Sequence, residues 1–141
     1  MSSKAYDKLS TEAKEVNEDD FFKKGSSGGT FISSGLKMAH DIVHERYAPS
    51  AWNIYTFHCS DGENWSEDND KAVDYMEKLI NLSQLAGYIQ IKGQQETLWG
   101  SEMAKVFEPL SSEAFKVVKV ANKKDVWPEF SRLLGGKYEI Q

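Results

Sequence analysis

The chain has 141 residues, enough for one domain that buries about two-thirds of its unfolded surface. Its net charge of −5 excludes a general nucleic-acid binder, because such proteins displace counterions with clustered Lys and Arg. No apolar run approaches the roughly 18 residues of a membrane helix, and no signal peptide is evident. The single cysteine, Cys59, cannot form an internal disulfide. These features predict a cytoplasmic protein that binds neither nucleic acid nor membrane.

The first thirty residues predict little regular structure. Residues 1–10 are polar and are expected to form a flexible segment, and residues 11–16 predict a short strand. The acidic run at 17–20 predicts the start of a short helix, because carboxylates suit the positive end of the helix dipole. A Ser/Gly turn at residues 25–29 is expected to end that helix.

The next segment predicts a helix followed by a strand. Apolar residues recur every three or four positions over residues 31–47, which is typical of a helix with one buried side. The stripe consists of Ile32, Leu36, Ala39, Val43 and Tyr47. Residues 52–59 are rich in aromatic and β-branched side chains and predict a strand, which ends in an acidic loop over residues 60–70.

The rest of the chain repeats this alternation. Helices are predicted over residues 69–85, 99–107 and 123–134, and strands over 88–91 and 115–120. Gly87 is expected to end the first of these helices, and residues 135–141 form a polar tail. Alternating strands and helices predict an α/β fold of three layers, with a mostly parallel sheet covered by helices on both faces. Sites in such folds form beyond the carboxyl ends of the strands.

Two loops at that edge carry the main functional candidate. Gly28-Gly29-Thr30 opens the helix at 31–47, and Asp61-Gly62 follows the strand at 52–59. A Thr hydroxyl and an Asp carboxylate suit Mg²⁺ or Mn²⁺, which prefer oxygen ligands. The glycines let the backbone pass close to an ion. In the alternative interpretation, the glycines only form a turn and Thr30 is a helix N-cap.

Other candidate sites have weaker support. The remaining carboxylates of the acidic loop, among them Glu63, Glu67, Asp68 and Asp70, are expected to be solvated or to lie at a helix start, with Ser66 or Asp68 as the N-cap. His40 and His44 have zinc-ligand spacing but no evident third ligand, so they are expected to face water. His58 and Cys59 are adjacent in a strand and point to opposite faces, which disfavours a catalytic pair.

A further alternative is an anion at the Ser/Gly turn over residues 26–29, because helix N-termini present free N–H groups. The turn lacks the Lys of a P-loop, so a nucleotide-hydrolysing site is not supported.

Three stretches together resemble the von Willebrand factor A fold, and more narrowly the YeaH/YhbH family of bacterial proteins. They are GGTFISSGL at residues 28–36, WNIY at 52–55 and SDGENW at 60–65, with TEAKEV at 11–16 and Phe21-Phe22 in support. The resemblance covers residues 11–134 and implies a Rossmann-like domain with a metal-ion-dependent adhesion site. In that site Thr30 matches the family's Thr ligand and Asp61 its Asp ligand.

The resemblance also implies that the domain is partial. The family's D-x-S-x-S loop does not occur in this sequence, so the first strands of the fold are expected to be missing. Metal affinity should then be weak or absent. An exposed sheet edge at residues 52–59 is expected either to form a homodimer or to be covered by a rearranged N-terminal segment.

The function implied is a non-enzymatic protein-interaction or scaffolding module, which binds a protein partner through the metal edge. The resemblance also suggests links to bacterial stress or sporulation physiology and to a serine protein kinase of the same gene neighbourhood. The alternatives are a metal- or phosphate-dependent hydrolase and a truncated domain without metal function.

Overall fold

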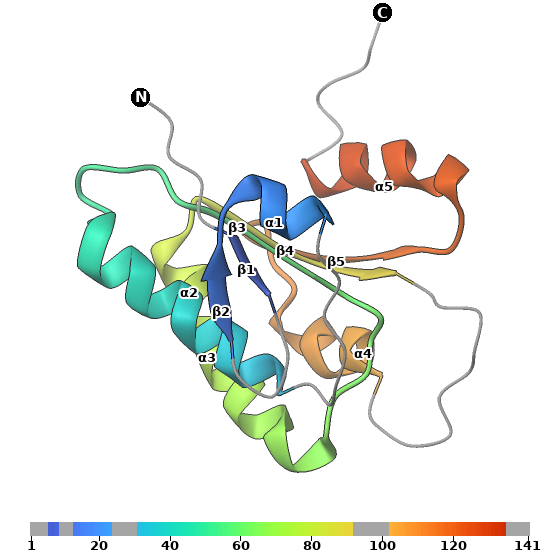
Figure 1. Ribbon diagram of the computed structural model, residues 1–141. Coiled ribbons are helices and arrows are strands. Elements are labelled where there is room, and N and C mark those ends of the chain that lie inside the picture. Colours follow the sequence, from blue (N-terminus) through green and yellow to red (C-terminus); the bar gives the residue numbers. More distant parts are fainter. Residues whose placement is uncertain (1–5, 9–12, 24–30, 92–101, 135–141) are drawn as a thin grey trace, which may run out of the picture.

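A computed structural model describes residues 6–8, 13–23, 31–91 and 102–134 (Figure 1). Its centre is a parallel sheet of three strands, β3 (Tyr55–Ser60), β4 (Leu85–Ile91) and β5 (Phe115–Val120), in the order β3-β4-β5. In the register of the sheet, His58 pairs with Tyr88, and Tyr88 pairs with Val117. All carboxyl ends of the three strands therefore lie at one edge of the sheet.

Helices cover both faces of this sheet, as Figure 1 shows. The helices α2 (Ile32–Arg46), α3 (Asn69–Leu82) and α4 (Met103–Phe107) lie on one face, and α5 (Val126–Leu133) lies on the other. Short 3-10 turns at Ser66–Asp68, Glu108–Leu110 and Lys123–Asp125 precede α3, follow α4 and precede α5. The predicted α/β architecture, with a parallel sheet between helices, is confirmed.

The main core lies between the sheet and α2, α3 and α4. Its fully buried side chains come from all of these elements and include Leu36, Met76, Tyr88, Phe107 and Phe115. The rings of Tyr88, Phe107 and Phe115 meet edge to face in sequence, with centroids 5.1 and 6.5 Å apart. On the other face, a smaller cluster consists of Ile89, Val118, Val120 and Leu133.

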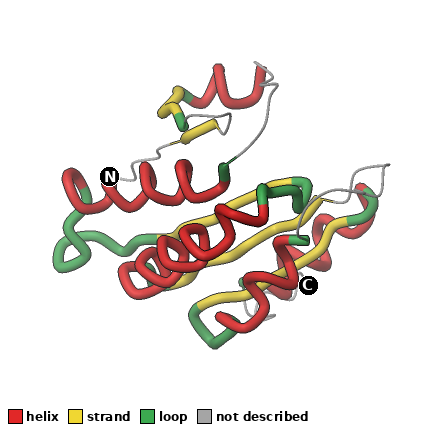
Figure 2. The backbone as a smooth tube through the Cα atoms, turned by 90° about the horizontal axis from the view of Figure 1, so that it is seen from below, coloured by secondary structure: helices red, strands yellow, loops and turns green. Residues whose placement is uncertain are grey.

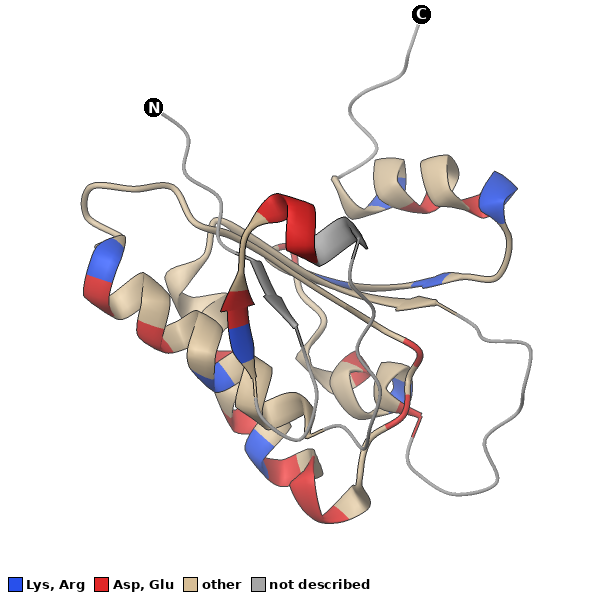
Figure 3. Ribbon diagram, viewed as in Figure 1, with Lys and Arg blue, Asp and Glu red and all other residues tan. Residues whose placement is uncertain are grey.

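A second, separate unit is formed by the N-terminal residues. The strands β1 (Tyr6–Lys8) and β2 (Lys14–Val16) pair antiparallel as a sheet of their own, and α1 (Glu18–Lys23) follows with an acidic first turn (Figure 3). Figure 2 shows this unit beyond α2, on the side away from the three-stranded sheet. The described part of the N-terminal segment therefore does not pair with β3.

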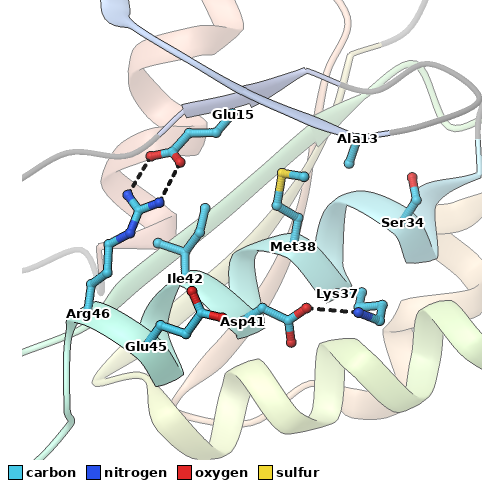
Figure 4. Close-up of a pocket in the computed structure, with 9 residues that line it drawn as sticks. All are labelled: Ala13, Glu15, Ser34, Lys37, Met38, Asp41, Ile42, Glu45 and Arg46. Carbon is cyan, nitrogen blue, oxygen red and sulfur yellow. Dashed lines mark hydrogen bonds and ion pairs between the residues drawn. The ribbon is translucent and has the colours of Figure 1, made fainter.

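An open groove separates this unit from α2 (Figure 4). The two terminal guanidinium nitrogens of Arg46, Nη1 and Nη2, each donate to the carboxylate of Glu15 at 2.8 Å, and this ion pair lies at one end of the groove. Met38 and Ile42 of α2 line it between the charged residues.

Most predicted element positions agree with the structure. The helix expected over residues 31–47 is α2, and its apolar stripe is buried at Ile32, Leu36 and Val43. The strand predicted at 115–120 coincides with β5. Of the helix predicted over 99–107, residues 99–101 lie outside the described residues. The short strand β1 falls within residues 1–10, which were expected to be a flexible segment. No described helix is both long and apolar enough to span a bilayer.

One boundary prediction is wrong. Gly87 was expected to end a helix, but α3 ends at Leu82 and Gly87 lies inside β4. The reason is a tertiary contact, because a Cβ atom at position 87 would lie 2.5 Å from Leu133 Cδ1. Glycine is needed here so that α5 can approach the sheet closely.

Candidate functional site

The start of α2 and the loop after β3 are held together by hydrogen bonds. The N–H of Ile32 donates to Asn64 Oδ1 at 3.1 Å, and the N–H of Ser33 donates to Asp68 Oδ2 at 3.0 Å. The hydroxyl of Ser33 also donates to the other carboxylate oxygen of Asp68. Thr30, Gly28 and Gly29 lie outside the described residues, but the residues that follow them directly are fixed against the loop that follows Asp61.

Asp68 is the central group of this contact. It stands at the N-cap position of α3, one of the two positions that the sequence predicted, but its carboxylate makes no cap bond to α3. It is only 5% exposed, so the expectation of a solvated carboxylate is wrong. It accepts instead from Ser33 and from the side-chain amide of Asn64, at 3.1 Å for the amide. Burial of a carboxylate is tolerated here because these donors and the positive end of the α2 dipole replace water.

The same contact affects the alternative of an anion at this helix start. The N–H groups of Ile32 and Ser33 are the donors that such an anion would use, and both already bond to Asn64 and Asp68. Asp68 therefore fills this position as an internal anion. The Ser/Gly turn itself lies outside the described residues.

Asp61 lies at the exposed end of the loop. Its Oδ1 accepts the N–H of Glu63 at 3.0 Å, which is an Asx turn, and Ser60 Oγ accepts the N–H of Gly62 at 3.2 Å. Gly62 has φ of +93°, a conformation that favours glycine. A Cβ atom at this position would also lie 2.6 Å from the side chain of Gln90. Gly62 is therefore required for the loop to carry Asp61 at this edge.

Gln90 connects the loop after β3 to α4. Its Oε1 accepts the N–H of Ala104 at 2.8 Å, and its Nε2 donates to Glu102 Oε1 at 3.3 Å. The N–H of Met103 donates to the carbonyl of Gly62 at 3.0 Å. Gln90 is 7% exposed and was not singled out from the sequence. The sequence signal that could have identified Gln90 is its position as a polar residue in an otherwise apolar strand.

A charged cluster adjoins Gln90. Glu102 accepts from Lys119 Nζ at 2.5 Å and pairs with Lys105 Nζ at 3.2 Å. Hydrogen bonds from these two lysines lower the pKa of Glu102 to about 2, so its carboxylate is charged at neutral pH. The cluster therefore links the loop before α4 to β5.

The polar residues of β3 and β4 form a buried row beside this edge. Ser60 Oγ lies 2.7 Å from the Tyr88 hydroxyl, and the His58 ring stacks on Tyr88 with centroids 5.6 Å apart. His58 is 9% exposed, and its Nε2 has no hydrogen-bond partner among the described residues. Burial lowers the pKa of His58 to about 4, so the imidazole is neutral at physiological pH.

The other sequence candidates do not assemble into a site within the described residues. Cys59 follows buried His58 in β3 and is exposed, and desolvation raises the pKa of its thiol. His40 and His44 stack on one another 6.0 Å apart on α2, with His40 also against Tyr75. No group of three His, Cys, Asp or Glu side chains within the described ranges is placed to hold a metal ion.

Comparison with known proteins gives a family. The family described as "Protein of unknown function (DUF444)" matches residues 6–137. A UPF0229 protein of Ruminiclostridium cellulolyticum is 46% identical over 124 residues, which cover 88% of this chain and 31% of the relative. UPF0229 proteins of Clostridium perfringens and Serratia proteamaculans are 44% and 36% identical, over 31% and 29% of their lengths.

This chain thus spans about a third of the length of the curated relatives that it matches. No solved structure matches it. The match over nearly the whole chain shows that the protein belongs to the DUF444 family, a family of unknown function.

Proposed function

We propose that this chain is a non-enzymatic protein-interaction module of the von Willebrand A type, with a metal-ion-dependent edge that includes Thr30 and Asp61. A divalent cation at this edge would bind a carboxylate from a protein partner. The observation that supports the proposal is the contact of Ile32 and Ser33 with Asn64 and Asp68. This contact places the residues that directly follow Thr30 beside the loop that carries Asp61.

The two oxygen donors fit a hard divalent cation that this chain binds weakly. Asp61 offers an exposed carboxylate, and Thr30 would offer a hydroxyl. These oxygen donors suit Mg²⁺ or Mn²⁺, which keep several water ligands in protein sites. Two protein ligands leave most of the coordination shell to water, so this chain alone should bind the ion weakly. The oxygen ligands that a tighter site requires would come from elsewhere in the longer proteins of this family.

The chemistry of the neighbouring side chains favours binding over hydrolysis. His58 is neutral and stacked on Tyr88, and the raised pKa of Cys59 keeps its sulfur protonated. Neither residue is therefore an activated nucleophile. A hydrolase that uses the same edge is the second candidate, and a truncated domain without metal function is the third.

The proposal is tested first with Mn²⁺ alone. Mn²⁺ titrated to millimolar concentration should broaden the amide NMR signals of residues 31–33 and 61–63 by paramagnetic relaxation. Asp61→Asn should abolish this broadening, whereas Glu63→Gln, which removes an exposed carboxylate from the same loop, should retain it. Broadening that is equal in both variants would mean that Mn²⁺ only accumulates near an acidic loop.

The interaction itself is tested by photocrosslinking in the cell from a probe at exposed Ser66. A partner of this site should be crosslinked by the wild-type chain and by Glu63→Gln. The crosslink should be lost in Asp61→Asn. Purified partner and chain should then associate in Mg²⁺ and separate in chelator. Association that persists in chelator would overturn the metal-dependent mechanism.

A further inference from the structure

The outer edge of β3 carries backbone groups that no described residue pairs. The N–H of Gln84 donates to the carbonyl of Ile54 at 2.7 Å, so Ile54 faces β4. Because backbone direction alternates along a strand, Thr56 and His58 also face β4, whereas Tyr55, Phe57 and Cys59 face away. β3 is the last strand on its side of the described sheet.

The side chains next to this edge are apolar and exposed. Tyr55 is 59% exposed and Phe57 is 41% exposed, although both lie in a strand. The Phe57 ring lies 6.4 Å from the ring of Phe130 on α5, and Trp127 of the same helix is 57% exposed. Residues 51–60 include no Asp, Glu, Lys or Arg. The edge thus combines backbone groups that are unpaired among the described residues with uncharged aromatic surface, which favours pairing with another strand.

Because the strand carries no charge, a second copy of the same strand can pair there without repulsion. We propose that a second copy of this chain pairs with β3 in antiparallel fashion, about a two-fold axis at Phe57, to make one continuous sheet. In this register Phe57 lies opposite Phe57 of the second copy, and Tyr55 lies opposite its Cys59. These are the residues whose backbone groups face outward, so they form the hydrogen-bonded pairs.

Two further features agree with a self-complementary edge. The register brings no like charges together, because the strand has none, and it pairs aromatic side chains across the interface. It also sets Thr56 of one copy opposite His58 of the other on the inner face of the sheet. His58 Nε2 is the buried side-chain atom without a hydrogen-bond partner among the described residues.

Cysteine crosslinking tests both the dimer and its register. Opposed residues in a hydrogen-bonded antiparallel pair have Cα atoms about 5.5 Å apart, a distance that a disulfide spans. Tyr55→Cys, with native Cys59 retained, should give disulfide-linked dimers on mild oxidation. Phe57→Cys in a Cys59→Ser background should also crosslink. Ile91→Cys in that background is the control, since Ile91 is 51% exposed but lies on β4, and it should stay monomeric.

Sedimentation over micromolar concentrations gives an independent measure. Phe57→Lys should raise the dimer dissociation constant at least ~10-fold, because two lysines would face one another across the axis. Ile91→Lys should leave the constant unchanged, and circular dichroism should show that both variants remain folded. A monodisperse wild-type monomer, or crosslinking no greater at positions 55 and 57 than at 91, would overturn the proposal. A monomer whose β3 pairs with a strand from another part of the longer family members would overturn it as well.

Discussion

The two edge strands of the described sheet differ: β5 is protected against pairing with another strand, and β3 is not. β5 carries Lys116 and Lys119, and the guanidinium of Arg132 donates to the outward carbonyl of Val117 at 3.4 Å. Figure 3 shows basic residues along β5 and no charged residue along β3. Charged side chains on an edge strand oppose pairing with another strand. The composition of the two strands therefore disfavours pairing at the outer edge of β5 and permits it at the outer edge of β3.

The helix layer shows the same asymmetry. Leu133 of α5 is fully buried and packs with Ile89, Val118 and Val120, over β4 and β5. Above β3 the same helix offers Phe130, which remains 36% exposed. The β5 side of the sheet is thus closed by its own helix, whereas the β3 side keeps apolar surface open beside an open edge.

The largest expected effect tests this helix packing. Leu133→Ala should lower the free energy of unfolding by about 2–5 kcal/mol, because it opens a cavity against β4 and β5. Phe130→Ala should cost about 1 kcal/mol in the monomer, since the ring is only partly buried. Urea unfolding at a concentration where the protein is monomeric measures both values. Equal losses would show that α5 covers the β3 side as tightly as the β5 side.

The next effect concerns His58 on β3. Its folded pKa of about 4 lies below the unfolded value of 6.5, so the unfolded state binds more protons between these pH values. Stability should therefore be highest above pH 6.5 and should fall by up to roughly 3 kcal/mol as the pH drops to 4. Below pH 4 this contribution is constant.

Unfolding curves across this pH range measure the loss. His58→Phe should remove most of it, while His44→Phe, a change at an exposed histidine of α2, should not. A wild-type profile that matches His58→Phe would show that His58 can be protonated in the folded protein. That result would mean that the β3 side is more open to water than its burial indicates.

Local sequence patterns predicted the elements well and the long-range contacts poorly. α2 and β5 follow from their own periodicity and composition, because those signals are local. Gly87 was misjudged because its role depends on Leu133, which lies far along the chain. From sequence alone, a glycine that ends a helix cannot be distinguished from one that makes room for a distant side chain.

The candidate site shows the same limit. Asp61 and Gly62 were singled out from a strand-to-loop pattern, and the structure places them in a tight turn at the carboxyl edge. The N-cap position of Asp68 was predicted, but its burial was not, because its partner Ser33 precedes it by 35 positions. A buried carboxylate that caps a distant helix leaves no local pattern. Whether Thr30 approaches Asp61 lies outside the described residues and stays a prediction.

The smallest expected change in stability tests the origin of the difference between the edges. Lys116→Thr combined with Arg132→Met removes two charges from the β5 edge, where Arg132 is exposed and Lys116 is partly exposed. Exposed charges contribute little, so the free energy of unfolding should change by less than ~1 kcal/mol. Self-association should nevertheless appear. It should be measured in a Phe57→Lys background, where pairing through β3 is blocked and any dimer must use another surface.

A double change of equal charge on the helices, Lys37→Thr with Lys78→Thr, is the matched control for this experiment. It removes two positive charges, as the β5 variant does, from lysines that are exposed in ion pairs on α2 and α3. If only the β5 variant associates, the charges on the edge strand are what ends the sheet there. If neither variant associates, the geometry of β5 and α5 protects the β5 edge without the charges. The absence of charge on β3 would then not be sufficient to explain why its edge is open. If both associate, the loss of positive charge acts without regard to its position, although net repulsion rises as the charge of −5 becomes more negative, and the two edges do not differ in kind.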